Sequence, residues 1–417
     1  MRLRTGLCIA LAAGATLAGC RRSAPPTPTP EPAQIVFAYP SGVLTPYLED
    51  LERSFEEENP RLDVVLRQTN PYNALTSATQ RADVAMIDQL SIALLADAGA
   101  LRPLDPLLQG TPELDLSVFY EGTLAALTWQ GQLWGLPADV DPWVLYYNKD
   151  LFDASGVPYP TNNWTWDDML EAALRITDPT ASPPLYGILG DMNRADFVPL
   201  VYQNGGALVD SLVAPTTVSF TDPAAVEAVE WYVSLALTYG VMPTPRELSQ
   251  MGGLETAVVT QRGAMWYGPL SERGGTLSST PWPFEWGLVA QPGNRARMTL
   301  LGMRTYVLSS NSERPTVAWE WLRYLATRPP VAFTVPPIKA VAESAEYLAA
   351  QRPDVAEAAL LSMQMGHTMP PTIWIDQVGG WLIQALQQVF QEQLSVADAL
   401  ASVQEKAEPL LAAEREP

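Results

Sequence analysis

The sequence of 417 residues is short of the side chains that most catalytic and metal sites use. It has a single histidine, His367, and two cysteines, Cys8 and Cys20. A Ser-His-Asp or Cys-His nucleophile would depend on that one imidazole, and a motif with two histidine ligands cannot occur. No G-x-x-x-x-G-K-[ST] loop is present, so the chain is not expected to hydrolyse ATP. We therefore expect no catalytic residue, no metal and no cofactor, and we interpret His367 as a structural or surface histidine.

Positive charge is also scarce. The chain has 25 Lys and Arg against 46 Asp and Glu, a formal net charge of −21. A surface this acidic argues against binding of nucleic acid or of an anionic membrane through a basic face. The acidity keeps the chain soluble and does not by itself name a ligand.

Long apolar runs are missing as well. The apolar segment from Leu7 to Leu17 is shorter than the roughly 20 residues that span a bilayer, and it follows two arginines. We interpret residues 1–19 as a signal peptide. The small residues before Cys20 resemble a bacterial lipobox, which implies acylation of Cys20; an ordinary signal peptide with an incidental cysteine is the alternative. Residues 20–33 would then be the lipidated cysteine and a Pro-rich tether, and the mature chain could form no disulfide.

The folded body begins at residue 34 with alternating strands and helices. Apolar runs at residues 35–39, 62–66 and 83–87 are typical of buried strands, and helical periodicity covers residues 44–58 and 92–98. This β-α-β order predicts an α/β fold with a largely parallel sheet and helices on its faces.

Residues 134–177 hold the densest group of signals. A Gly-Leu-Pro segment is followed by a short link at 138–142, a strand at 143–147, and a Gly/Pro-rich loop at 153–161. Thr165 and Asp168 then form a capping box, which predicts a helix start.

The order "GLP, link, LYYNKDLF, G-x-x-x-P, TWDD-helix" in this stretch resembles the extracellular solute-binding proteins of ABC importers, the family that includes receptors for maltose and other oligosaccharides. Further likenesses lie at residues 94–105, 197–210 and 263–269, and the resemblance extends over residues 35–415. Met303 and Arg304 depart from the small residues common at that place.

The resemblance implies a two-lobe periplasmic-binding-protein fold, each lobe a largely parallel sheet flanked by helices, with three hinge crossings. It places lobe one at 34–140 plus 267–304 and lobe two at 141–266 plus 305–417. Ligands of open α/β sheets bind outside the carboxyl ends of the strands, so the cleft between the lobes is the expected site.

A neutral polyol offers hydroxyl groups at its rim and apolar faces above and below, and it calls for carboxylates, amides and aromatic rings. For any single aromatic residue, packing within a lobe is the alternative to ligand contact. The residues expected to bind ligand are Asp88, Asp139, Asp141, Trp143, Tyr202, Asn204, Trp266, Tyr267 and Trp374.

The resemblance implies a monomeric receptor, anchored by lipid on the extracytoplasmic side, that captures a sugar or oligosaccharide and delivers it to the transmembrane subunits of an ABC permease. Within the same class, the alternative is a polyamine, a polyol phosphate or another polar solute. A phosphate would require Arg194, Arg304 or Lys149 to converge on it. A secreted carbohydrate-active enzyme that uses Asp139 and Asp141 is the alternative from another class.

Overall fold

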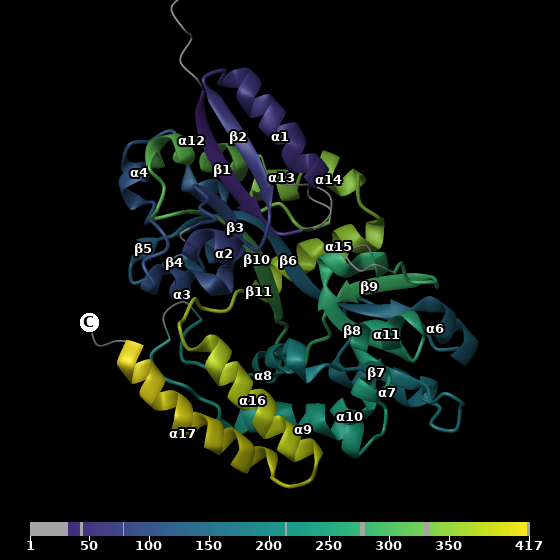
Figure 1. The fold of residues 1–417 in the computed structure, drawn as a ribbon. Coiled ribbons are helices and arrows are strands. Elements are labelled where there is room, and N and C mark those ends of the chain that lie inside the picture. Colours follow the sequence, from purple (N-terminus) through teal and green to yellow (C-terminus); the bar gives the residue numbers. More distant parts are fainter. Residues whose placement is uncertain are drawn as a thin grey trace, which may run out of the picture.

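A computed structural model describes residues 32–41, 45–77, 79–212, 215–275, 280–328 and 333–414. Its described part is a mixed α/β fold in which helices flank one large sheet of order β2-β1-β3-β10-β6-β8-β7, with β9 and β11 attached at its side (Figure 1). The predicted signal peptide, the predicted lipidation site Cys20 and nearly all of the predicted tether lie outside the described residues.

The first strands form the predicted parallel unit. β1 (Ala33–Tyr39) pairs in parallel with both β2 (Leu62–Gln68) and β3 (Val84–Asp88). α1 (Thr45–Glu58) lies between β1 and β2 in the chain and buries Leu48 and Phe55. The β-α-β prediction is therefore confirmed for this part of the chain.

Two long strands connect the halves of the sheet. β6 (Gly135–Asn148) is continuous through the residues expected to be a short link at 138–142, because its backbone pairs with β10 (Thr299–Leu308) from Gly135 to Pro142. β10 also pairs with β3, from Arg304 to Leu308. Both of these pairings are antiparallel, so the parallel arrangement stops at the crossing strands.

The second half of the sheet is built on the other end of β6. Val144 to Tyr147 pair with both β8 (Gly263–Pro269) and β9 (Trp286–Ala290), antiparallel in each case. β7 (Tyr186–Leu189) pairs in parallel with β8. The expectation of a largely parallel sheet thus holds for β1 to β3 and not for this half, where the crossing strand imposes antiparallel neighbours.

Separate cores accompany the two halves. One cluster holds β1, β3 and the first part of β6, and a second packs beneath the other half of β6 together with the carboxyl-terminal helices. A third cluster, which contains Val140, Trp266 and Val335, covers the opposite face near the crossing.

The chain divides between these cores differently from the predicted boundaries over residues 267–326. β9, expected in lobe one, pairs with the lobe-two end of β6. α12 (Pro315–Ala326), expected in lobe two, packs Trp321 and Leu322 into the core of β1 and β3, and Figure 1 shows it beside these strands. The reason is that β10, and not β8, carries the chain back to the first half.

The remaining helices follow local signals that the sequence carries. The capping box at Thr165 and Asp168 is confirmed at the start of α7 (Trp166–Ile176). α6 (Lys149–Ser155) is capped by Asn148 and ends at Gly156 in the left-handed conformation. The other helices are α2 (Pro71–Thr76), α3 (Ile92–Asp97), α4 (Asp105–Gln109), α5 (Glu121–Ala125), α8 (Val198–Gln203), α9 (Pro223–Leu237), α10 (Pro245–Gln250), α11 (Gly253–Val259), α13 (Lys339–Ala342), α14 (Ala345–Ala349), α15 (Pro353–Met365), α16 (Ile375–Phe390) and α17 (Val396–Glu414). Short 3-10 helices are η1 (Gln89–Ser91), η2 (Leu116–Val118), η3 (Met192–Arg194) and η4 (Leu270–Gly275), and short strands are β4 (Thr128–Trp129), β5 (Gln132–Leu133) and β11 (Gly366–His367).

Gly187 in β7 packs closely against α7, and we expect the fold to lose stability when this glycine is replaced by a larger residue. A Cβ atom there would lie 2.4 Å from Cα of Ala173 in α7, and backbone cannot move aside cheaply. We expect Gly187→Ala to lower the free energy of unfolding by about 1–3 kcal/mol. Gly380→Ala, in α16 with no atom within 4 Å of the new Cβ, should raise it by about 0.5–1 kcal/mol. Urea unfolding of both variants checks this; equal effects would contradict the packing described.

Candidate functional site

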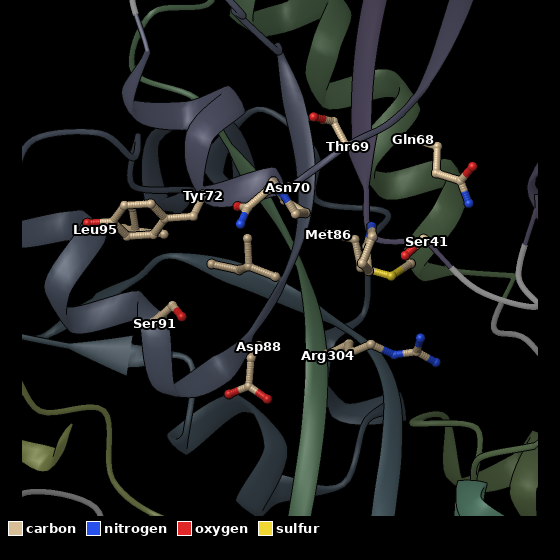
Figure 2. A pocket seen from close by; sticks show the side chains of 13 residues that line it. Ser41, Gln68, Thr69, Asn70, Tyr72, Met86, Asp88, Ser91, Leu95 and Arg304 are labelled. Carbon is tan, nitrogen blue, oxygen red and sulfur yellow. The ribbon is translucent and has the colours of Figure 1, made fainter. Parts of the chain in front are cut away.

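A hollow of about 720 Å³ lies at the carboxyl ends of β1, β2 and β3, the edge where open α/β sheets bind ligands. The loop after β1, the loop after β2 and the end of β3 each contribute to its wall, and β10 closes it from the side (Figure 2). We call this hollow the strand-end pocket. Its lining residues are Pro40, Ser41, Gln68, Thr69, Asn70, Pro71, Tyr72, Met86, Ile87, Asp88, Ser91, Leu95 and Arg304.

An ion pair between the crossing strands forms one side of the strand-end pocket. Nε of Arg304 on β10 donates to Oδ1 of Asp139 on β6 at 3.1 Å, and a terminal guanidinium nitrogen donates to Oδ2. The Thr334 hydroxyl donates to the same Oδ2 at 3.2 Å. The side chain of Asp139 is 1% exposed and that of Arg304 is 31% exposed. Asp139 is therefore a buried partner, whereas Arg304 reaches the pocket.

Asp141 lies two residues further along β6 and is held from the other half of the molecule. The backbone N–H of Ser271 donates to Oδ1 at 2.9 Å, and its hydroxyl donates to Oδ2 at 2.5 Å. Burial raises the pKa of Asp141 to about 7, although the two Ser271 donors and Arg304 act in the opposite direction. Asp141 thus ties the crossing strand to η4.

Asp88 ends β3 and is exposed in the strand-end pocket. Its Oδ1 accepts a hydrogen bond from the Leu90 N–H at 2.9 Å, which caps η1. The partial enclosure by the pocket raises the pKa of Asp88, and the negative charge of Asp376 adds to the rise. Asp376 belongs to the first turn of α16, whose core is that of the second half. A charge on the second half thus acts on the Asp88 carboxyl group.

A smaller hollow of about 260 Å³ lies in the second half at the carboxyl end of β8. Its wall includes Arg194 and Glu272, which form an ion pair at 3.0 Å. The Arg194 guanidinium also lies 5.0 Å from the ring centroid of Trp143, which is half-buried. Because Ser271 lines this hollow and binds Asp141, it adjoins the crossing strands.

The other predicted ligand residues lie within the lobe cores. Trp266 is 1% exposed and stacks on Tyr146, and the hydroxyl of Tyr267 lies 3.3 Å from Sδ of Met169. Tyr202 and Trp374 pack in the core of the second half. The buried Asn204 donates to the carbonyl of Ala224 at 2.9 Å and to Glu227 at 3.0 Å. These five residues thus have packing or hydrogen-bond partners within the second half, and Trp266 also lines the smaller hollow.

Sequence reasoning missed the polar residues at the end of β2 and in the loop after it. Gln68, Thr69 and Asn70 line the strand-end pocket, as does Tyr72, whose side chain is exposed. Their signal was available, because they follow the predicted second strand at the same carboxyl edge as Asp88. Arg304 was considered only as part of a phosphate site.

The three cations that a phosphate would require are engaged separately. Arg304 pairs with Asp139 and Arg194 pairs with Glu272. Nζ of Lys149 lies over the ring of Tyr159 at 5.9 Å from its centroid, in the second half. The part of the chain that the structure describes therefore has no converging set of these three residues. Within the same ranges, no group of His, Cys, Asp and Glu has the geometry for a metal ion, and no helix is long and apolar enough to cross a membrane.

Asp196 gives the protein a pH-dependent stability. Its side chain is buried, Oδ2 accepts from the N–H of Asp191 at 2.7 Å, and Oδ1 has no partner among the described residues. Burial raises the pKa of Asp196 from 3.8 to about 7. The folded state then binds the proton more tightly than the unfolded state. The stabilisation that this tighter proton binding gives is fully present below pH 4 and is lost as pH rises to 7.

We expect Asp196→Asn to gain stability over the wild type by up to about 1.4 kcal/mol per pH unit between pH 4 and pH 7. Urea unfolding of both proteins across that range measures the difference. A difference that stays constant with pH would contradict the proposed burial of a titrating carboxyl group.

Comparison with known proteins supports the same architecture. The family model described as bacterial extracellular solute-binding protein matches residues 41–331. A solved structure of an ABC substrate-binding protein from Listeria monocytogenes, in complex with cycloalternan, superimposes with a TM-score of 0.79 at 22% identity and covers 92% of this chain and 100% of that chain. At that identity the likeness concerns the fold, which is the two-lobe fold that was predicted.

Sequence relatives match over shorter segments. A Brucella abortus protein named as a binding protein is 27% identical over 197 residues, 46% of each chain. The arabinooligosaccharide-binding protein of Bacillus subtilis is 30% identical over 142 residues, 30% of this chain and 32% of the relative. The chain thus spans less than half the length of these relatives.

Proposed function

Because the chain belongs to the bacterial extracellular solute-binding proteins, we propose that it is the receptor of an ABC importer, that it captures a sugar or oligosaccharide between its lobes, and that it delivers this solute to the permease. The observation that supports the proposal most is the strand-end pocket, whose wall combines uncharged polar side chains with apolar ones such as Met86, Ile87 and Leu95. Amide and hydroxyl side chains such as Gln68, Asn70 and Ser91 match the donors and acceptors of a polyol.

Capture depends on the crossing strands. β6 and β10 join the two halves, so rotation about them changes the gap between the strand-end pocket and α16 while each core stays intact. A solute that contacts both halves only when they are close favours the closed form by its differential affinity. The permease then distinguishes the closed form from the open one.

The solute leaves this protein chemically unchanged in the proposed role. A glycosidase mechanism would use the carboxylates of Asp139 and Asp141. In this structure Asp139 is paired with Arg304, and Asp141 accepts hydrogen bonds from Ser271. The lipid anchor on Cys20, the extracytoplasmic location and the monomeric state belong to the same proposal and rest on the sequence.

A thermal-shift screen tests the proposal. The purified protein is mixed with maltotriose, arabinotriose, lactose, spermidine or sn-glycerol 3-phosphate, and the recovered solute is analysed by chromatography. A sugar at one hundred times its dissociation constant should stabilise the fold by about 2.7 kcal/mol. Stabilisation by a sugar that is recovered intact supports the proposal. Stabilisation by spermidine or sn-glycerol 3-phosphate alone, or recovery of cleaved sugar, would overturn it.

A further inference from the structure

A buried carboxyl group lies behind the smaller hollow of the second half. Asp196 follows η3 by two residues and is 1% exposed. Its Oδ2 accepts a hydrogen bond from the N–H of Asp191 at 2.7 Å, whereas Oδ1 has no partner among the described residues. A buried carboxylate with one oxygen unpartnered is costly, so the neutral, protonated form suits this position better.

Arg194, at the end of η3, interacts with two carboxyl groups. In the hollow it pairs with Glu272 at 3.0 Å, and its guanidinium lies 5.0 Å from the ring centroid of Trp143. Its positive charge also acts on Asp196, where it opposes the rise in pKa that burial causes. The pair with Glu272 is the arrangement expected while Asp196 carries a proton.

The other titratable groups around Asp196 do not compensate its charge. They are Tyr232 of α9, Tyr267 of β8, Asp191 before η3 and Glu272 of η4. Burial, and after it the charge of Asp196, raises the pKa of both tyrosines, so these two remain neutral. The two carboxylates repel an ionised Asp196. Among the described residues, Arg194 is therefore the cation that acts on this group.

We propose that Asp196 is a proton-dependent positioning residue for Arg194. With a proton on Asp196, Arg194 stays in the smaller hollow with Glu272; once that proton is released to solvent, Arg194 turns inward to the Asp196 carboxylate. The direction follows from burial. The Glu272 side chain is 34% exposed and is partly solvated by water, whereas the ionised Asp196 has far less solvent and gains more from a cation.

Loss of Arg194 would change the charge of the smaller hollow. The charged residues that line it are Arg194, Glu255 and Glu272, so departure of the arginine leaves two negative charges and no positive one. The hollow lies at the carboxyl end of β8 and adjoins the crossing strands. We therefore expect solute affinity to be highest with Asp196 protonated and to fall as pH rises through about 7. This consequence rests on the proposed function, whereas the movement of Arg194 does not.

Tryptophan fluorescence without solute tests the movement of Arg194. The contribution of Trp143 is the difference between each protein and the same protein carrying Trp143→Phe, recorded from about two pH units below to about two above the pKa of Asp196. We expect a transition near pH 7 in the wild type and none in Asp196→Asn or Arg194→Met. Burial also raises the pKa of Asp141 to about 7. Asp141→Asn should nevertheless keep the transition.

Isothermal titration with the sugar that stabilises the protein tests the consequence. The protonated fraction of Asp196 falls from about nine tenths at pH 6 to about one tenth at pH 8, so wild-type affinity should fall by up to about tenfold. Asp196→Asn should hold one affinity over this range. The control is Asp115→Asn, an exposed carboxylate that caps η2 through the Ser117 N–H at 2.9 Å. It should lose affinity with pH as the wild type does.

The outcomes separate the inference from the proposed function. A Trp143 signal that is constant with pH in the wild type, or that still changes in Asp196→Asn, would overturn the positioning role. A transition lost in Asp141→Asn and kept in Asp196→Asn would assign it to Asp141 and overturn the inference as well. Sugar affinity that stays constant between pH 6 and pH 8 would overturn the link to capture. If no sugar binds at any pH, the proposed function fails, and the fluorescence transition still decides the movement of Arg194.

Discussion

Arg304→Met is expected to lower the free energy of unfolding by about 3 kcal/mol. The reason is Asp139, whose side chain is 1% exposed and whose charge is compensated by Arg304. Removing one partner of a buried pair leaves the other charge in a medium of low polarity, and Thr334 alone cannot replace the fork. The loss would weaken the pairing of the crossing strands β6 and β10, because Asp139 and Arg304 join these two strands. Urea unfolding, followed by tryptophan fluorescence, measures it.

Two further variants isolate the cause. Asp139→Asn combined with Arg304→Met removes both charges, and we expect it to recover more than half of the lost stability. Arg323→Met breaks pairs with Glu113 and Glu320 whose carboxylate side chains are 65% and 43% exposed, so it should cost less than about 1 kcal/mol. An Arg304→Met variant that is no less stable than Arg323→Met would show that Asp139 does not depend on Arg304.

Ser91→Trp is expected to weaken sugar binding at least about 100-fold, which corresponds to about 2.7 kcal/mol. Ser91 lines the strand-end pocket, and it precedes α3 without capping that helix by a side-chain hydrogen bond. An indole at this position takes up space within the pocket while the backbone of α3 keeps its own hydrogen bonds. Isothermal titration with the sugar that stabilises the wild type in the screen measures the loss.

Ser54→Trp serves as the control for this steric block. Ser54 is exposed on α1 and does not line the strand-end pocket. Its variant should bind the sugar as the wild type does, and both variants should unfold at similar urea concentrations. Normal binding by a folded Ser91→Trp would place the solute elsewhere in the molecule.

Local sequence signals predicted the elements of this fold well. Three apolar runs of strand type gave β1, β2 and β3, and the Thr165 and Asp168 pair gave the start of α7, because these features depend on residues close in sequence. The continuity of β6 through Asp139 and Asp141 was not predicted. It depends on pairing with β10, more than 150 residues later in the chain, as in the Arg304–Asp139 pair.

The candidate site was predicted unevenly for a similar reason. Asp88 was found because it ends a strand at the carboxyl edge, where chain order alone fixes its place. Trp266 and Tyr267 are neighbours on β8, and their side chains face different cores. The sequence alone does not show that both of these faces of β8 are covered by a core. Arg304 was undervalued because its partner, Asp139, became visible only with the register of the crossing strands.

The distance between the two halves, with and without sugar, tests the receptor mechanism most directly. The sequence makes the measurement simple, since Cys8 and Cys20 are its two cysteines and both can be replaced by serine. Spin labels are then attached to cysteines introduced at Asn73 on α2 and Gln377 on α16, exposed positions of opposite halves. Pulsed electron paramagnetic resonance should show one shorter, narrower distance distribution when the sugar that stabilises the protein is added, and no change with sn-glycerol 3-phosphate. An unchanged distribution at saturating sugar would contradict capture by closure of the lobes.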